Sequence, residues 1–174
     1  MAKISIICGS FRKDSYNRKL SEIVKVIINN EYSEKIEEVK ILDIHLFPFF
    51  SEDLEKDVPE NILEFKKEID ESSGVIFITP EYNRSIPGVL KNAIDWASRP
   101  VGKNSFSNKK IICMGVSGGR LGTVSAQNEL KKILVYLNTY VIGQPEIYVG
   151  EYKIEDEKVL ELVAKGVRTL IEKI

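Results

Sequence analysis

The segment GVIFITPEYNRSIPGVLKNAIDWASRP, residues 74–100, predicts a buried strand, a connector and a helix in direct succession. Residues 74–78 are all apolar or glycine, which is typical of a strand in a sheet that is covered on both faces. Apolar residues then recur at helical spacing from Ile86 onward. Pro87 fits the first turn of that helix, and Ser85 fits its N-cap position. The stretch therefore predicts one strand–helix unit of an α/β fold.

The same alternation of apolar strands and amphipathic helices extends over the whole chain. Further strands are expected at 4–8, 39–42, 111–116 and 140–149, the last interrupted by Gly143 and Pro145. Further helices are expected at 15–28, 59–69, 125–137 and 159–174. Because such alternation gives right-handed crossovers, we predict one α/β domain over residues 1–174. Its five-stranded parallel sheet has helices on both faces.

The composition excludes several classes of partner. The 25 Lys and Arg residues nearly balance the 26 Asp and Glu residues, so there is no broad attraction for nucleic acid or anionic lipid. No apolar run approaches the roughly 20 residues that span a bilayer. The N-terminus, MAKISIICGS, has the character of a strand and not of a signal peptide. We expect a cytoplasmic protein that binds neither nucleic acid nor membranes.

The residues that most often bind metals or act as nucleophiles are few and scattered. Cys8 and Cys113 each lie in an apolar run without CxxC spacing, so we expect buried thiols and no metal site. A reactive thiol or a disulfide remains an alternative. His45 is the only histidine, and we expect it at the edge of the solvent and not in a zinc site or catalytic triad.

Three loops hold the unusual polar residues of the chain. Ligands of doubly wound sheets bind outside the carboxyl ends of the strands, where the strand order reverses. The loops that follow the first, third and fourth predicted strands are CGSFRKDSYN (8–17), TPEYNRS (79–85) and GVSGGRLGT (115–123). We therefore expect the ligand to bind among these loops.

The first loop has the composition of a phosphate site. It enters a helix, so free backbone N–H groups and the positive helix end converge there. Ser10, Ser15 and Asn17 add short donors, and Arg12 adds a planar guanidinium. In the alternative interpretation, Ser15 or Asp14 only caps the helix and Arg12 is solvated. The spacing matches neither a P-loop nor a Rossmann dinucleotide motif.

The third-strand loop combines a flat ring with polar groups. Pro80 stiffens the chain, Tyr82 offers a face for packing on a ring, and Asn83 offers hydrogen bonds. The alternative is a well-capped turn with Glu81 and Arg84 in solvent. In the fourth-strand loop, glycines around Ser117 would let a planar ring approach the backbone, although such turns are also ordinary loops.

Three stretches resemble one known family. GSFRKDSYNRKL (9–20) resembles the GSxRxxSxNxxL signature of the NADPH-dependent FMN reductases, which are flavodoxin-like proteins. TPEYNRSIPGVLKNAIDWASRP (79–100) and LFPFFSEDLE (46–55) are similar to further segments of that family, particularly of its chromate and quinone reductase branch. The resemblance implies a flavodoxin-like three-layer sandwich.

The resemblance also implies a cofactor site for one FMN per subunit. It implies phosphate contacts at Ser10, Arg12, Ser15 and Asn17, with Tyr16 beside them. It implies that the isoalloxazine is bordered by Pro80, Glu81, Tyr82 and Asn83 on one side and by Ser117, Gly118 and Gly119 on the other. Members of the family pair as homodimers or homotetramers with the flavin cleft at the subunit contact, where Arg84 is expected to lie.

The implied activity is hydride transfer from NADPH or NADH through FMN to a quinone, azo compound, chromate or free flavin, in a ping-pong reaction. The flavin does the chemistry, so no catalytic side chain or metal is expected. The alternatives are a flavodoxin-type electron carrier and a regulatory module of similar architecture. Thr123 and Ser125 depart from the family pattern, because they stand where glycine and arginine are usual.

Overall fold

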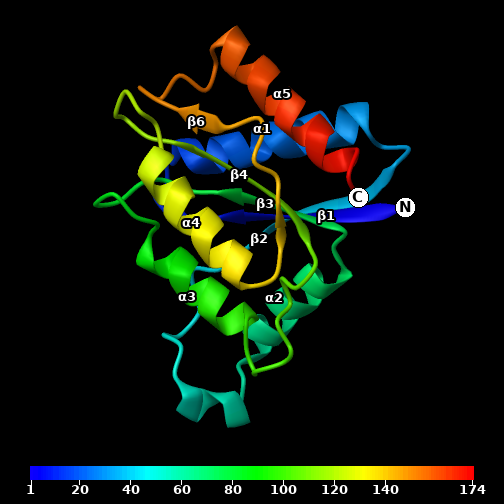
Figure 1. Ribbon diagram of the computed structural model, residues 1–174, viewed down its shortest axis with the longest axis vertical. Coiled ribbons are helices and arrows are strands. Elements are labelled where there is room, and N and C mark those ends of the chain that lie inside the picture. Colours follow the sequence, from blue (N-terminus) through cyan, green and yellow to red (C-terminus); the bar gives the residue numbers. More distant parts are fainter.

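The computed structural model describes residues 1–174 as one sheet between two layers of helices (Figure 1). The strands are β1 (Ala2–Cys8), β2 (Ile36–Leu42), β3 (Gly74–Ile78), β4 (Lys110–Val116), β5 (Tyr140–Val141) and β6 (Ile147–Val149). The helices are α1 (Tyr16–Glu31), the 3-10 helix η1 (Glu52–Lys56), α2 (Glu60–Glu71), α3 (Gly88–Ala97), α4 (Val124–Tyr136) and α5 (Glu157–Ile171). None of these helices is both long and apolar enough to cross a membrane.

All strand pairs are parallel, in the order β2-β1-β3-β4-β5. The strand order reverses between β1 and β3, as in flavodoxin-like sheets. The predicted fifth strand is divided: β5 pairs with the start of β4, and β6 pairs with its end. Gly143 and Pro145 lie in the unpaired segment between the two pieces, which confirms the predicted irregularity.

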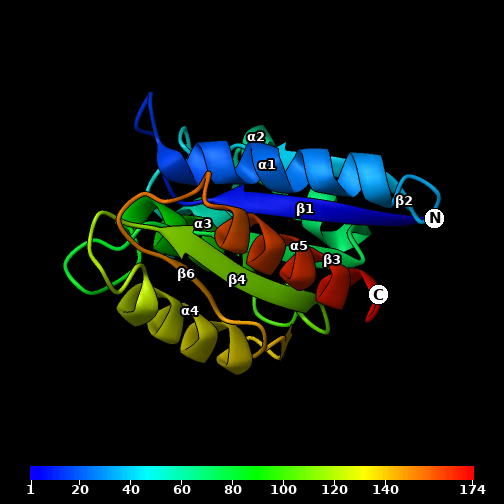
Figure 2. The ribbon, with the colours of Figure 1, turned by 90° about the horizontal axis from the view of Figure 1, so that it is seen from above.

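The two faces of the sheet hold separate hydrophobic cores. One core packs against α1 and α5, and the other packs against α2, α3 and α4 (Figure 2). Side chains of β3 alternate between them: Ile76 and Ile78 join the first core, whereas Val75 and Phe77 join the second. β3 is completely buried for this reason, as its apolar sequence predicts.

The predicted cap of α3 is wrong. The helix begins at Gly88, with Pro87 at the N-cap position and no side chain capping it. Proline disfavours helical backbone in the residue before it, so Ile86 cannot begin the helix. Ser85 instead closes a two-residue turn with Tyr82, in which each backbone N–H donates to the other carbonyl at 2.9 Å. The Ser85 hydroxyl donates to Glu129 Oε2 at 2.6 Å, on α4.

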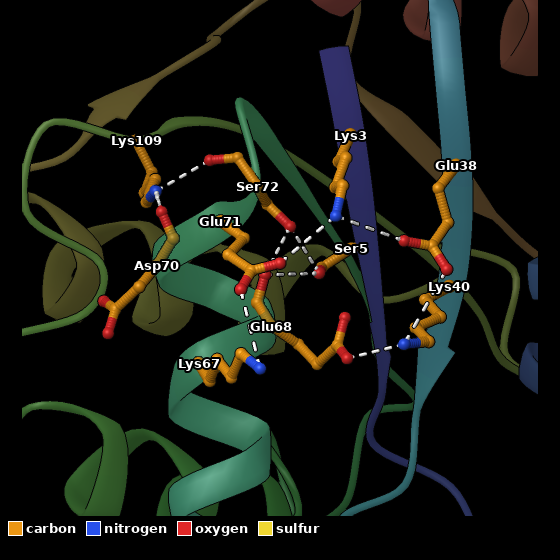
Figure 3. A network of polar contacts seen from close by, with 10 residues as sticks. All are labelled: Lys3, Ser5, Glu38, Lys40, Lys67, Glu68, Asp70, Glu71, Ser72 and Lys109. Carbon is orange, nitrogen blue, oxygen red and sulfur yellow. Dashed lines mark hydrogen bonds and ion pairs between the residues drawn. The ribbon is translucent and has the colours of Figure 1, made fainter. Parts of the chain in front are cut away.

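The two ends of the sheet differ in character. The loops after β1, β3 and β4 gather on the left of Figure 1, while both termini lie on the right. At the amino end, Lys3 Nζ lies 3.1 Å from Glu71 and Lys40 Nζ lies 2.5 Å from Glu68, which joins β1 and β2 to α2 (Figure 3). These pairs are exposed or half-buried, so each contributes little to the stability of the fold.

Candidate functional site

A cleft of about 300 Å³ opens among the three loops at the carboxyl ends of β1, β3 and β4. All but two of the residues expected around the cofactor line this cleft. The lining residues that were expected are Ser10, Arg12, Ser15, Tyr16, Asn17, Pro80, Glu81, Tyr82, Ser117 and Gly118. Asn83 and Gly119 lie outside the cleft lining. Val116 and Tyr152 line it as well, and sequence reasoning missed both. The cleft lies where the strand order reverses, which is the position that the fold favours for a ligand.

Ser15 has the capping role that the sequence left open as an alternative. Its hydroxyl oxygen accepts from the backbone N–H groups of Asn17 at 3.2 Å and Arg18 at 3.3 Å, so it caps α1. The same hydroxyl donates to Ser10 Oγ at 2.8 Å. Both serines are buried on the cleft wall. The serine that caps α1 is therefore also part of the polar wall of the cleft.

Asn17 is held by β4 and does not point freely into the cleft. Its side-chain amide donates to the carbonyl of Val116 at 3.0 Å, and its oxygen accepts from the N–H of Val116 at 2.9 Å. This pair of bonds fastens the start of α1 to the end of β4. The amide nitrogen has a second N–H with no partner in the chain, and only this donor is left for the phosphate bond that the sequence suggested.

Backbone N–H groups supply most of the donors in the first loop. The amides of residues 10–14 and of Tyr16 donate to no group in the chain. They lie at the start of α1, where the helix dipole favours negative charge. Arg12 is exposed and donates to the Asp14 carbonyl at 2.9 Å, and Lys19 Nζ lies 5.0 Å from the centre of the Tyr16 ring. This end of the cleft is therefore suited to an anion.

Glu81 connects two of the loops. Its Oε2 accepts from the backbone N–H of Ala126 at 3.0 Å, in the first turn of α4. A carboxylate is favoured at a helix N-terminus because it pairs a free amide and complements the dipole. The alternative of a solvated Glu81 is therefore wrong. Its carboxylate holds the third-strand loop against α4.

The tip of the third-strand loop, Asn83 and Arg84, lies outside the cleft lining. Asn83 and Arg84 both have left-handed backbone, with φ of +51° and +65°, as the two-residue turn between Tyr82 and Ser85 requires. Both side chains are exposed. Tyr82 lines the cleft and remains 53% exposed, so part of its ring is free for a ligand.

The fourth-strand loop is tightly folded around its glycines. Ser117 Oγ donates to the Gly122 carbonyl at 2.7 Å, and Gly122 has a φ of +62°. A Cβ on Gly115 would lie 2.1 Å from the carbonyl oxygen of Thr79, so only glycine fits there. Thr123 is fully buried beside it and accepts from Gln127 Nε2 at 2.8 Å. The unusual threonine is therefore part of the packing behind the loop.

The two cysteines and the histidine lie in surroundings that suit structural side chains and not reactive ones. Cys8 and Cys113 are free and buried, as expected. Burial raises the pKa of the Cys113 thiol to about 12 and also raises the pKa of Cys8. His45 lies in an exposed loop with its ring hydrogen-bonded to Asp43, as its solvent-edge prediction requires. Burial would raise the pKa of the Asp43 carboxyl, but the hydrogen bonds from His45 outweigh it and the pKa is lowered.

Comparison with known proteins gives a consistent set of relatives. The sequence profile of the NADPH-dependent FMN reductases matches residues 2–153. The chain is 40% identical to a 2-hydroxy-1,4-benzoquinone reductase from a Burkholderia species, over 84% of this chain and 78% of the relative. It is 39% identical to a quinone reductase of Pseudomonas putida, over 84% of this chain and 77% of the relative.

A solved structure agrees over almost the full length. It is that of the flavoenzyme NAD(P)H:(acceptor) oxidoreductase FerB from Paracoccus denitrificans, which superposes with a TM-score of 0.90 at 36% identity. The alignment covers 99% of this chain and 96% of that one. The flavodoxin-like architecture inferred from the resemblance is thereby confirmed. With the profile match over most of its length, the chain belongs to the NADPH-dependent FMN reductase family.

Proposed function

We propose that this chain binds FMN in the cleft and transfers hydride from NAD(P)H to a small acceptor of the quinone class. The observation that carries the proposal is the convergence of three sequence-distant loops on one cleft, at the reversal point of the sheet. The quinone class is suggested by the names of the relatives. We also propose that residues 1–174 act as one FMN-binding domain.

The anionic end of the cleft fits the phosphate of FMN. The unpaired amides of residues 10–14 and of Tyr16 would donate to phosphate oxygens, and the α1 dipole would favour the charge. Ser10 adds a buried hydroxyl, and Arg12 adds a positive charge at the rim. Ser15 and Asn17 act through position: Ser15 orients Ser10, and Asn17 holds the loop on β4.

The other end of the cleft fits a flat, partly polar ring. Pro80 and Tyr82 supply apolar surface on one side, and Ser117 and Gly118 supply backbone that a ring can approach closely. Glu81 keeps the two sides at a fixed separation through Ala126. Asn83 would reach the ring only through its backbone or after a rearrangement of the turn.

The chemistry that FMN supplies when bound is hydride transfer at its ring, so the chain contributes binding and orientation. We propose that a flavin ring bound in this cleft keeps one face open for one further planar molecule at a time. NAD(P)H and the acceptor would then bind in turn, which predicts a ping-pong reaction. Double-reciprocal plots at several acceptor concentrations should be parallel; intersecting lines would contradict this step.

The first test is a spectrum. Apoprotein mixed with FMN should bind one equivalent, and NADH or NADPH added without air should bleach its absorbance near 450 nm. Failure to bind FMN would defeat the proposal. Flavin that binds but that neither nucleotide bleaches would instead identify an electron carrier. The faster nucleotide would reveal the preference between NADH and NADPH.

We also propose that the chain forms a homodimer or homotetramer through the groove between α3 and α4. This groove of about 440 Å³ is lined by Tyr136, which is 87% exposed, and by the half-buried Ile133 and Leu137. Exposed apolar surface of this kind favours association. Light scattering should give at least twice the chain mass, and Tyr136→Glu should shift the protein toward the monomer. An unchanged mass for this variant would place the interface elsewhere.

A cytoplasmic location fits this function. NAD(P)H is supplied there, and the two buried thiols are free, as is usual in a reducing compartment.

A further inference from the structure

Tyr152 lines the cleft although it lies outside the three loops that the sequence predicts around the ligand. It follows β6, near the carboxyl edge of the sheet. Its ring stacks on the ring of Tyr16, with centroids 4.5 Å apart and an angle of 20° between the planes. The ring also lies close to Gly118, because a Cβ added there would lie 2.8 Å from the Tyr152 hydroxyl. Tyr152 therefore bridges the first loop and the fourth-strand loop.

The backbone that carries this ring is strained. Glu151 and Tyr152 have φ values of +52° and +55°, and neither is a glycine. Left-handed backbone costs an ordinary residue about 1–2 kcal/mol. Such conformations persist where the surrounding structure enforces them, and they cluster at functional sites. Two in succession are what a two-residue turn requires, and here the Lys153 N–H donates to the Gly150 carbonyl at 3.1 Å, so this turn fixes where the Tyr152 ring lies.

Contacts on both sides hold the turn in this form. The N–H of Tyr152 donates to the carbonyl of Ser117 at 3.2 Å, and the N–H of Glu151 donates to the carbonyl of Gly119 at 3.2 Å. Downstream, Ile154 is buried in the core beside α5. The segment is thus tied to the same loop that forms one wall of the cleft.

The hydroxyl of Tyr152 is left without a partner. It takes part in no hydrogen bond of the chain, whereas the nearby Tyr148 hydroxyl bonds to both Glu146 and Lys131. The Tyr152 side chain is 45% exposed and lies on the cleft wall. A ring fixed by stacking, with a free hydroxyl at the rim of a ligand cleft, is preorganised to bind a ligand oxygen.

We infer that Tyr152 is a further FMN-contacting residue, which closes the cleft between its phosphate end and its ring end and donates a hydrogen bond to an oxygen of the cofactor. The inference rests on the proposed function, since it takes FMN as the ligand. It assigns to the segment after β6 a role that none of the three family motifs covers.

The test measures FMN affinity of the apoprotein by quenching of flavin fluorescence, for the wild type, Tyr152→Phe and Tyr152→Ala. Tyr152→Phe keeps the stack and removes only the hydroxyl, so the dissociation constant should rise about 3- to 10-fold. Tyr152→Ala also removes the wall and should raise it further. Tyr140→Ala, at an exposed tyrosine of β5 near the other end of β4, is the control and should leave the affinity unchanged.

Thermal melting of the apoproteins distinguishes a direct contact of Tyr152 with FMN from a role of Tyr152 in the stability of the fold. Tyr152→Phe should have the melting temperature of the wild type, because its ring still stacks on Tyr16. It should nevertheless bind FMN less tightly. If Tyr152→Phe binds FMN as tightly as the wild type, the inference is overturned, whatever happens to Tyr152→Ala. If the wild type itself binds no FMN, the proposed function fails instead. The two failures are therefore distinct.

Discussion

Glu81 illustrates how a single side chain joins the parts of the cleft. The family resemblance places it beside the ring of the cofactor, yet its carboxylate accepts from the N–H of Ala126. Both statements are compatible, because the residue lines the cleft and also anchors its wall. We interpret Glu81 as a positioning residue: it acts on a ligand by fixing the loop that contains Pro80 and Tyr82.

Removal of this anchor should weaken cofactor binding. In Glu81→Ala the amide of Ala126 loses its acceptor and the loop loses its attachment, so the FMN dissociation constant should rise about 10-fold. Glu81→Gln keeps an acceptor without the charge, so its FMN dissociation constant should rise by only about 2- to 3-fold. Fluorescence titration measures both. Glu64→Ala, at an exposed carboxylate of α2, is the matched control, and equal affinities in all variants would refute the positioning role.

The two cysteines should be inert in the folded protein. A thiol with a pKa of about 12, as in Cys113, has a thiolate fraction of about one in ten thousand at pH 8, and Cys8 is also shifted upward by burial. Iodoacetamide at pH 8 should therefore modify neither residue within an hour. In denaturant both should react, as mass spectrometry would show. Rapid native modification of Cys8 would reveal an accessible thiol and contradict its burial.

At the scale of the elements, two lysine side chains cap the C-terminal ends of helices to which they do not belong. Lys66 Nζ donates to the carbonyls of Ala97 at 2.9 Å and of Arg99, at the end of α3. Lys109 Nζ donates to the carbonyls of Asp70 and Ser72, at the end of α2, both at 2.7 Å (Figure 3). Burial lowers the pKa of both amines. Cations at helix C-termini satisfy free carbonyls and complement the dipole.

Lys66→Met should lower the free energy of unfolding by about 1–2 kcal/mol, since carbonyls at the end of α3 would lose a charged donor. Chemical denaturation measures the effect. Lys67→Met is the control on the same helix, where the side chain is 72% exposed and pairs only weakly with Glu71. It should change stability by less than about 0.5 kcal/mol. Equal effects of the two substitutions would show that the capping bonds contribute little.

The elements themselves were largely readable from the sequence, because their apolar periodicity reflects burial directly. Their ends were harder. Ser15 or Asp14 was the alternative cap of α1, and the structure gives that role to Ser15. Ser85 looked equally suitable as a cap, but α3 begins only after Pro87. The backbone of Ser85 is hydrogen-bonded to Tyr82 instead. Competition of this kind depends on tertiary contacts that no local pattern encodes.

For the whole molecule, parallel topology explains why the site was predictable in outline. Loops after β1, β3 and β4 must meet at one edge of the sheet, so three loops far apart in sequence were expected to form one cleft. The engagement of Asn17 with Val116 and of Glu81 with Ala126 was not predictable, because both bonds join distant segments. Tyr152 was missed because its segment has neither a motif nor a regular pattern.

The central claim is that one cleft relays hydride from NAD(P)H to an acceptor through FMN, and separate half-reactions test it most directly. In anaerobic sequential mixing, one equivalent of NAD(P)H should bleach the bound flavin. After removal of the oxidised nucleotide, one equivalent of a benzoquinone should restore the flavin absorbance. Both steps should be at least as fast as kcat. A reduced protein that is not reoxidised by the quinone, or is reoxidised far more slowly than turnover, would contradict the account.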